Sequence, residues 1–174
     1  MQVHFIDEKD FIRYKFKTKP YKHQYDAFLK CKDKDSYALF MEQGTGKSKV
    51  IIDNIAYLYR NGKIDTAIIA APKGVYRNWL SSEYKTHMPD DVKEFTDVII
   101  WSPNETKINV DNLVNFLKPN HKLKLFIINI EALSTDKGKN YLHRLLNSSK
   151  AFFCIDESTN IKNRTARRTK ACLK

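Results

Sequence analysis

The chain has 174 residues, of which 42% are hydrophobic and 12% aromatic, and its formal net charge at pH 7 is +11. This length suits about one domain with a real core, and the composition excludes an intrinsically disordered chain. The positive charge suits a polyanionic partner such as nucleic acid, although many soluble proteins are basic without one. No apolar run approaches the ~20 residues that span a bilayer, so we expect no membrane partner.

The cysteines indicate a reduced, intracellular chain. Cys31, Cys154 and Cys172 are odd in number and form no C-x-x-C pair. The first residues have neither the basic head nor the long apolar segment of a signal peptide. The histidines show no spacing typical of metal ligands. We therefore expect a cytoplasmic protein, located in the host cytoplasm if the protein is viral.

Apolar periodicity predicts strands and helices that alternate along the chain. Residues 12–16 alternate apolar and basic side chains, which predicts a short strand with one basic face. Pro20 suits the first turn of a helix, whose apolar stripe follows at helical spacing. That stripe consists of Tyr21, Tyr25, Phe28 and Leu29.

The later predicted elements complete the alternation. They are a strand at 36–41, a helix ending at Asn61-Gly62, a strand at 66–71, a helix holding Val75 and Trp79, a strand at 97–101, a short helix at 111–117, a strand at 123–130, a helix around 141–146 and a strand at 151–155. Apolar strands alternating with amphipathic helices predict an α/β fold, in which a mostly parallel sheet is covered on both faces to give three layers. Nothing marks a domain boundary, so residues 1–174 are expected to form one domain.

A glycine-rich loop lies between the predicted strand at 36–41 and the following helix. It reads Met41-Glu42-Gln43-Gly44-Thr45-Gly46-Lys47-Ser48. Strand, glycine loop and helix form the context in which G-K-S binds phosphate, because glycines let backbone N–H groups converge on an anion at a helix N-terminus. One departure is Met41, which stands where the pattern has its first glycine.

The loop predicts the nucleotide ligands. The expected cofactor-binding residues are Gln43, Gly44, Thr45, Gly46, Lys47 and Ser48. Lys47 is expected on the β- and γ-phosphates, as a catalytic residue, and the Ser48 hydroxyl on Mg²⁺.

Two adjacent carboxylates follow the last predicted strand. Asp156 and Glu157 lie at its carboxyl end, which is where an α/β sheet binds its ligand. In a P-loop ATPase the first carboxylate holds the Mg²⁺ shell and the second activates the attacking water. An acidic helix cap is the plainer alternative. We expect Asp156 to be a metal ligand and Glu157 to be the catalytic general base.

Taken in order, these motifs resemble the first ATPase lobe of superfamily-two helicases, and within them the Swi/Snf-related DNA translocases. The resembling segments are Lys19–Gln24, Glu42–Ser48, Ala70–Lys73 with Trp79 and Glu83, Ile127–Leu133, and Asp156–Asn163, which is similar to the D-E-x-x-x-x-K-N form of the Walker B box. The resemblance implies a RecA-like lobe that hydrolyses ATP with Mg²⁺ to move along double-stranded DNA. In such a lobe Gln24 would read the adenine edge and Lys73 would contact the DNA backbone.

The chain departs from the family in two places. Thr159 stands where the family usually has His, which puts in doubt how hydrolysis is coupled to the next motif. No segment resembles the motif that follows Walker B or the second lobe with its arginine finger. We therefore expect an incomplete lobe, truncated after Walker B, whose partner is a second RecA-like lobe in cis or on a separate chain. The small, lysine-rich chain also resembles phage products.

Two other functions remain open. One is a P-loop motor of the packaging-terminase type, although such a motor has no reason to carry Lys162-Asn163 or the motif at 19–24. The other is a non-catalytic fragment that binds nucleic acid or a partner chain, against which the intact Lys47, Asp156 and Glu157 argue. The basic run at 162–170 either binds DNA or is a solvated helix face.

Overall fold

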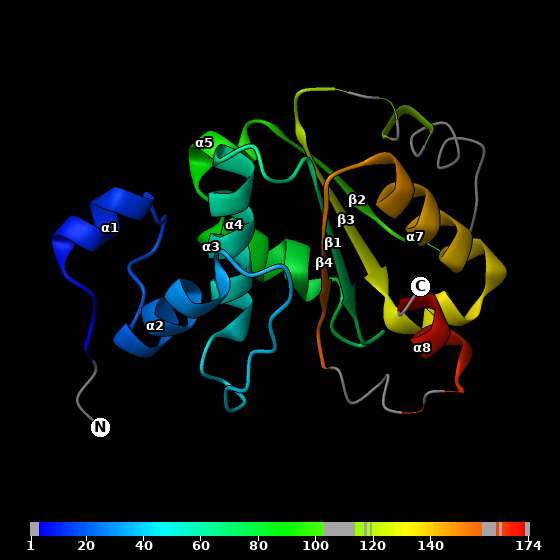
Figure 1. The fold of residues 1–174 in the computed structure, drawn as a ribbon, viewed down its shortest axis with the longest axis horizontal. Helices are drawn as coiled ribbons and strands as arrows, with labels where there is room; N and C mark the ends of the chain where they lie inside the picture. Colours follow the sequence, from blue (N-terminus) through cyan, green and yellow to red (C-terminus); the bar gives the residue numbers. More distant parts are fainter. Residues whose placement is uncertain are drawn as a thin grey trace. The chain divides into compact units, whose positions relative to one another are not determined.

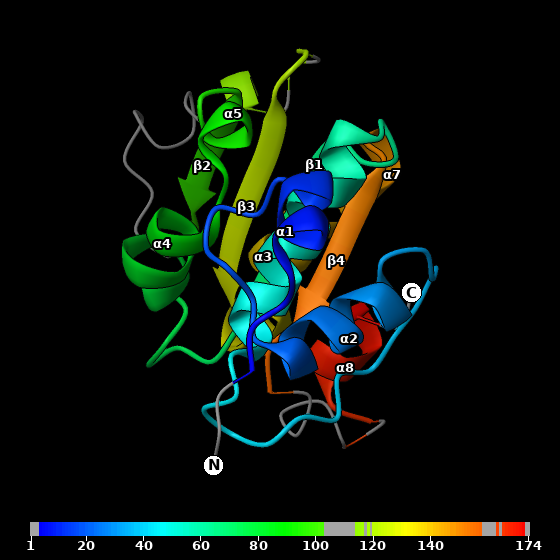
Figure 2. The ribbon, with the colours of Figure 1, turned by 90° about the vertical axis from the view of Figure 1, so that its left-hand side faces the viewer.

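The structure is a computed structural model that describes residues 4–102, 114–116, 118, 120–157, 163 and 165–172. The chain divides into two compact units. The first contains residues Met1–Lys63 and Trp79–Glu94, and the second contains Ile64–Asn78 and Phe95–Lys174. Figures 1 and 2 trace the elements of both units, from two sides, in the colours of the sequence.

The first unit is built from helices. They are α1 (Glu8–Tyr14), α2 (Lys22–Cys31), α3 (Lys47–Arg60), the π-helical η1 (Trp79–Tyr84), α4 (Lys85–His87) and α5 (Asp90–Lys93). An aromatic cluster forms its core, where the Tyr14 ring lies 5.1 Å from that of Phe28 and 6.1 Å from that of Tyr57. Phe28 and Val50 are almost fully buried, so α2 and α3 share this core.

Residues 8–14 form helix α1, so the predicted strand at 12–16 is wrong. The Asp7 carboxylate accepts the N–H of Asp10 at 2.8 Å, and acidic residues occupy the first turn, which favours a helix N-terminus. The helix ends at Lys15, whose left-handed backbone (φ 52°) directs its N–H to the Ile12 carbonyl. The side chain of Ile12 is 64% exposed, so the alternation did not mark a buried face.

Residues 36–41 adopt no strand, so this prediction is wrong as well. Leu39 and Met41 do pack against the aromatic core of the first unit, while Phe40 is 97% exposed. The alternation of inward and outward side chains is therefore present without a ladder of hydrogen bonds. A strand requires a neighbouring strand, which a local pattern cannot supply.

The second unit contains a four-stranded sheet in the order β2-β3-β1-β4. The strands are β1 (Thr66–Ala71), β2 (Thr96–Ile100), β3 (Leu123–Asn129) and β4 (Ala151–Ile155), and every pairing between them is parallel. β1 and β3 are buried at each position, whereas β2 and β4 are half-buried. The predicted α/β class, its parallel sheet and the four corresponding apolar strands are confirmed.

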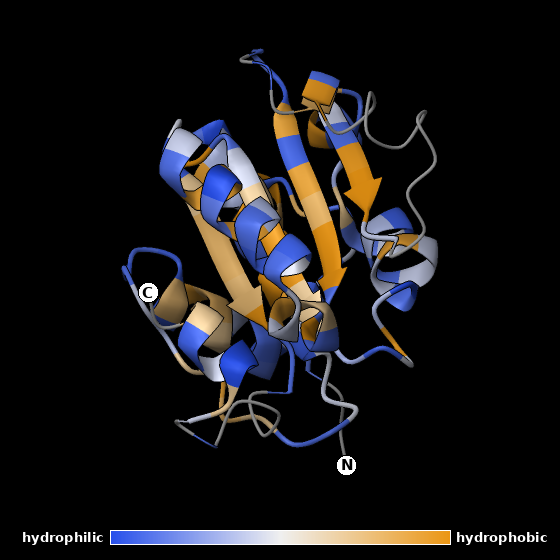
Figure 3. Cartoon of the chain, turned by 90° about the vertical axis from the view of Figure 1, so that its right-hand side faces the viewer, coloured by the Kyte–Doolittle hydropathy of each residue, from blue (hydrophilic) through white to orange (hydrophobic). Residues whose placement is uncertain are grey.

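Helices α7 (Asp136–Ser148) and α8 (Arg167–Cys172) and the 3₁₀-helix η2 (Ile130–Ser134) complete the second unit. Ile68 and Phe126 of the sheet share a core with Leu142 and Leu145 of α7 and with Ala171 of α8. The hydroxyl of Thr135 accepts the N–H of Gly138 and so caps α7. In Figure 3 the strands are mostly orange, while the outward face of α7 is largely blue.

Two other expectations concern helices. Most of the predicted helix at 111–117 lies outside the described residues. The predicted helix around Val75 and Trp79 appears as a series of turns at residues 73–77 followed by η1. No helix in the described ranges is both long and apolar enough to cross a membrane.

Candidate nucleotide-binding site

The glycine loop of the first unit has the backbone that its sequence predicts. Gly44 (φ 79°) and Gly46 (φ 84°) are both left-handed, a conformation that is strained for residues with a Cβ atom. Gly46 is the N-cap of α3, so the loop leads directly into the first turn of a 14-residue helix. The Thr45 hydroxyl donates to the Glu42 carbonyl at 2.7 Å and tightens the turn.

Lys47 and Ser48 occupy the first two positions of α3. Nζ of Lys47 donates to the carbonyl oxygens of Met41 (3.1 Å) and Glu42 (2.9 Å), so its ammonium group lies over the glycine loop. The first N–H groups of a helix have no partner within the helix and carry its positive dipole end. A cation and free backbone donors therefore meet at this loop, which fits a phosphate group. Gln43 is exposed beside them.

The structure brings Gln24 of α2 to the glycine loop. Its Nε2 donates to the Thr45 carbonyl at 3.1 Å, and its Oε1 accepts the N–H of Tyr21 at 3.0 Å. Nε2 of His23 lies 3.0 Å from the same Thr45 oxygen. Sequence reasoning selected Gln24 by resemblance but missed His23. Nothing distinguishes His23 from the other histidines except its position next to Gln24.

A buried ion pair lies one residue beyond Ser48 in α3. Nζ of Lys49 lies 2.7 Å from Oδ2 of Asp53, and the two side chains are only 5% and 2% exposed. Burial raises the pKa of Asp53 to about 6, against the lowering effect of Lys49. Among the described residues, Oδ1 of Asp53 and Oδ1 of Asn54 have no hydrogen-bond partner. The first turns of α3 therefore hold an ion pair that sequence reasoning did not anticipate.

The second unit carries the acidic pair. Asp156 and Glu157 directly follow β4, and the Asp156 N–H donates to the Ala70 carbonyl at 2.8 Å, which extends the pairing with β1. Glu157 is exposed and has a left-handed backbone (φ 54°). Such strain in a non-glycine residue often marks a functional position. Ser158, Thr159 and Lys162 lie outside the described residues.

Lys73 lies just beyond β1, at the same edge of the sheet as the acidic pair. Its backbone N–H donates to both carboxylate oxygens of Glu131, at 3.1 and 3.3 Å. Glu131 follows β3, so this contact joins the loops after two neighbouring parallel strands. Glu131 belongs to the resembling segment at 127–133, but the sequence predicted no contact for its side chain. Trp79 is buried.

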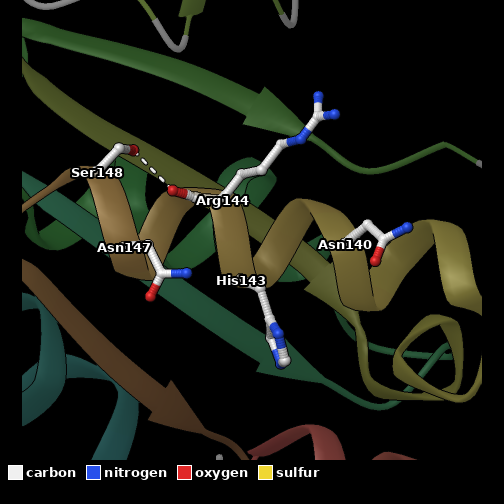
Figure 4. A pocket seen from close by; sticks show the side chains of 5 residues that line it. All are labelled: Asn140, His143, Arg144, Asn147 and Ser148. Carbon is white, nitrogen blue, oxygen red and sulfur yellow. Dashed lines mark hydrogen bonds between the residues drawn. The ribbon is translucent and has the colours of Figure 1, made fainter.

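A separate polar hollow lies along α7. Asn140, His143, Arg144, Asn147 and Ser148 line it. Figure 4 shows that these side chains point in different directions along the helix, and that the Ser148 hydroxyl bonds back to the Arg144 carbonyl. None of them is a predicted site residue, so the hollow lies apart from the predicted chemistry.

A magnesium ion bound with nucleotide needs few protein ligands. Among the described residues, no group of three or more His, Cys, Asp and Glu side chains could hold a metal ion. Mg²⁺ usually keeps several waters and binds one or two carboxylates together with substrate phosphates. The Ser48 hydroxyl in the first unit and the Asp156 carboxylate in the second are each a ligand of the kind that Mg²⁺ accepts.

The family of the chain follows from comparison with known proteins. A comparison with curated proteins finds no match. The family described as type III restriction enzyme, res subunit, matches residues 14–174, a range that includes the glycine loop, Lys73 and the acidic pair. This match supports the superfamily-two resemblance but does not single out the Swi/Snf-related branch or a phage source. The chain therefore belongs to the type III restriction enzyme res-subunit family, as a superfamily-two helicase-like N-terminal ATPase lobe.

Proposed function

We propose that this chain is the ATP-binding lobe of a motor that hydrolyses ATP to move along double-stranded DNA, as a helicase or a translocase. The observation that carries the proposal is the glycine loop. It joins two left-handed glycines, the N-terminus of α3 and the Lys47 ammonium group in one place. The printed name of the family, a restriction enzyme subunit, supports DNA as the nucleic acid.

The roles of the residues follow from their chemistry. The N–H groups of Gly44–Ser48 and the Lys47 side chain hold the phosphates, and Gln24 reads the adenine edge. The Gln24 amide keeps one N–H and one lone pair after its bonds to Thr45 and Tyr21. Ser48 and Asp156 would hold Mg²⁺, which when bound neutralises charge on the phosphate oxygens. Glu157 accepts a proton from the attacking water.

Full turnover needs a second RecA-like lobe, in cis or on a separate chain. Phosphoryl transfer depends on positioning and charge neutralisation, and an arginine finger contributes ~10³–10⁵ in rate. This chain alone should therefore bind nucleotide and turn it over very slowly. A DNA-stimulated rate close to that of intact two-lobed motors, measured with the pure chain, would contradict this part of the proposal.

Titration with a fluorescent ATP analogue, with and without Mg²⁺, tests nucleotide binding directly. We expect saturable, Mg²⁺-dependent binding that Lys47→Ala weakens at least about tenfold, because a phosphate-bound cation is lost. Lys30→Ala is the matched control, since Lys30 is an exposed lysine of α2. No binding by the wild-type chain would leave the non-catalytic binding fragment as the better explanation.

The hydrolytic roles are tested in a complete, two-lobed version. Glu157→Gln should keep ATP binding and lose hydrolysis, because the amide cannot accept the proton of the water. Asp156→Ala should weaken the Mg²⁺-dependent part of binding. An unchanged rate after Glu157→Gln would exclude Glu157 as the general base. A nuclease domain in place of a second lobe would favour the packaging-terminase alternative.

A further inference from the structure

Two adjacent side chains of α2 converge on one atom of the glycine loop. Nε2 of His23 and Nε2 of Gln24 lie 3.0 and 3.1 Å from the carbonyl oxygen of Thr45. A carbonyl oxygen only accepts hydrogen bonds, so Nε2 of His23 must carry a proton here. The oxygen therefore accepts two hydrogen bonds, the number that the two lone pairs of a carbonyl oxygen allow.

The orientation of this carbonyl decides where the next N–H points. In a planar trans peptide, the C=O of Thr45 and the N–H of Gly46 point in opposite directions. Holding the Thr45 oxygen toward α2 therefore turns the Gly46 N–H away from α2. Rotation of this peptide would instead turn a carbonyl oxygen toward the side that the N–H now faces. Glycine offers little steric resistance to such a rotation.

From these contacts we infer that His23 is a positioning residue for the glycine loop, holding the Thr45–Gly46 peptide in the orientation that presents its N–H to phosphate. This inference rests on the proposed nucleotide binding and adds a residue to it. His23 acts through the backbone of Thr45 and does not itself touch the nucleotide.

An aromatic contact restrains the ring of His23. Its ring is stacked on that of Tyr21, with centroids 5.8 Å apart and planes inclined by 22°. Tyr21 in turn lies 4.8 Å from the ring of Phe5. The side chain of Gln24 is oriented by a hydrogen bond instead, because its Oε1 accepts the N–H of Tyr21. The two donors are thus held by different groups of Tyr21, its ring and its backbone N–H, and a substitution of His23 removes neither group.

Two substitutions separate the hydrogen bond from the packing of the ring. His23→Phe keeps an aromatic ring on Tyr21 but removes the donor. His23→Gln loses the ring but places an amide N–H at a similar reach. The affinity of each variant for the fluorescent ATP analogue with Mg²⁺ is measured alongside its thermal unfolding midpoint.

We expect His23→Phe to weaken nucleotide affinity about threefold to tenfold, the range of one neutral hydrogen bond, and His23→Gln to return it to within about twofold of wild type. The unfolding midpoints should stay close to that of wild type. Unchanged affinity in His23→Phe, or equal weakening in both variants, would overturn the inference while wild-type binding still supports the proposed function. Absence of binding by the wild-type chain would overturn both.

Discussion

A Cβ atom on Gly46 would lie 2.3 Å from Nε2 of Gln24, closer than real Cβ atoms approach other atoms. A side chain at residue 46 would therefore displace the amide group of Gln24, which bonds the Thr45 carbonyl from α2. Gly44, on the other side of Thr45, has nothing within 4 Å of the corresponding position. The two glycines share a left-handed backbone but differ in their surroundings, which makes them separable by mutation.

Alanine at these two positions should give different losses of stability. Gly44→Ala should cost about 1–2 kcal/mol, the strain of a left-handed residue with a Cβ atom. Gly46→Ala also forces the Gln24 amide away from the Thr45 carbonyl and should cost somewhat more, by up to the worth of one hydrogen bond. Adding Gln24→Ala should recover part of the extra loss. Urea unfolding of wild type and the three variants measures these differences, and equal losses for the two glycine variants would show that the Gln24 side chain moves aside freely.

Replacing one member of the buried Lys49–Asp53 pair should destabilise the protein, whereas replacing both members should not. Lys49→Met or Asp53→Leu alone leaves one charge buried without its partner, which typically costs ~3–5 kcal/mol. The double variant removes both charges and should be as stable as wild type or more stable. Denaturant unfolding of the single and double variants tests this. A double variant no better than the worse single variant would refute it.

Asp53 should also give the protein a distinct pH dependence of stability. Its folded pKa of about 6 lies above its ordinary value of 3.8, so the folded state binds the proton more tightly than the unfolded state. The proton on Asp53 stabilises the folded state fully below about pH 4, and this stabilisation is lost as the pH rises through 6. The free energy of unfolding should fall by roughly 3 kcal/mol over this range.

The comparison with Asp53→Asn isolates this effect. The stability of wild type relative to Asp53→Asn should fall between pH 4 and 7. His87, whose pKa is lowered by burial and then by Lys49, titrates nearby but is present in both proteins. Unfolding free energies that follow parallel pH curves would show that Asp53 does not titrate in this range.

The left-handed backbone of Glu157 predicts a stability difference between two small substitutions. Glu157→Gly relieves the strain, whereas Glu157→Ala keeps it, and the greater unfolded-state entropy of glycine offsets part of the gain. We expect the glycine variant to be about 0.5–1 kcal/mol more stable than the alanine variant, with an unfolding midpoint up to about 4 °C higher. Differential scanning calorimetry gives both values. An alanine variant of equal stability would mean that residue 157 is unstrained.

Lys73 should contribute to DNA binding through charge. If it contacts one phosphate, Lys73→Ala should weaken binding similarly for all sequences and lower the slope of log K against log salt by about 1. Lys150→Ala is the control, because Lys150 precedes β4 at the opposite edge of the same sheet. Fluorescence anisotropy at several salt concentrations provides the slope. Equal slopes for the two variants would remove Lys73 from the interface.

The sequence predicted β1, β2, β3 and β4 to within a residue or two, because each contains a short run of apolar residues typical of a strand in a parallel sheet. It failed where the pattern was short. Residues 12–16 alternate for five positions, but the Asp7 cap and the acidic first turn favoured helix α1. Residues 37–41 form a short apolar run, yet a strand depends on a neighbour that lies elsewhere in the chain.

The sequence by itself determined the α/β class, the left-handed glycines before Lys47 and the acidic pair after β4, because these depend on local backbone freedom and side-chain chemistry. Only the tertiary structure decided that His23 and Gln24 meet at the Thr45 carbonyl and that Glu131 holds the Lys73 N–H. These partners are separated by about 20 to 60 residues of chain. No local propensity encodes such a pairing, since packing of whole helices and strands brings the atoms together.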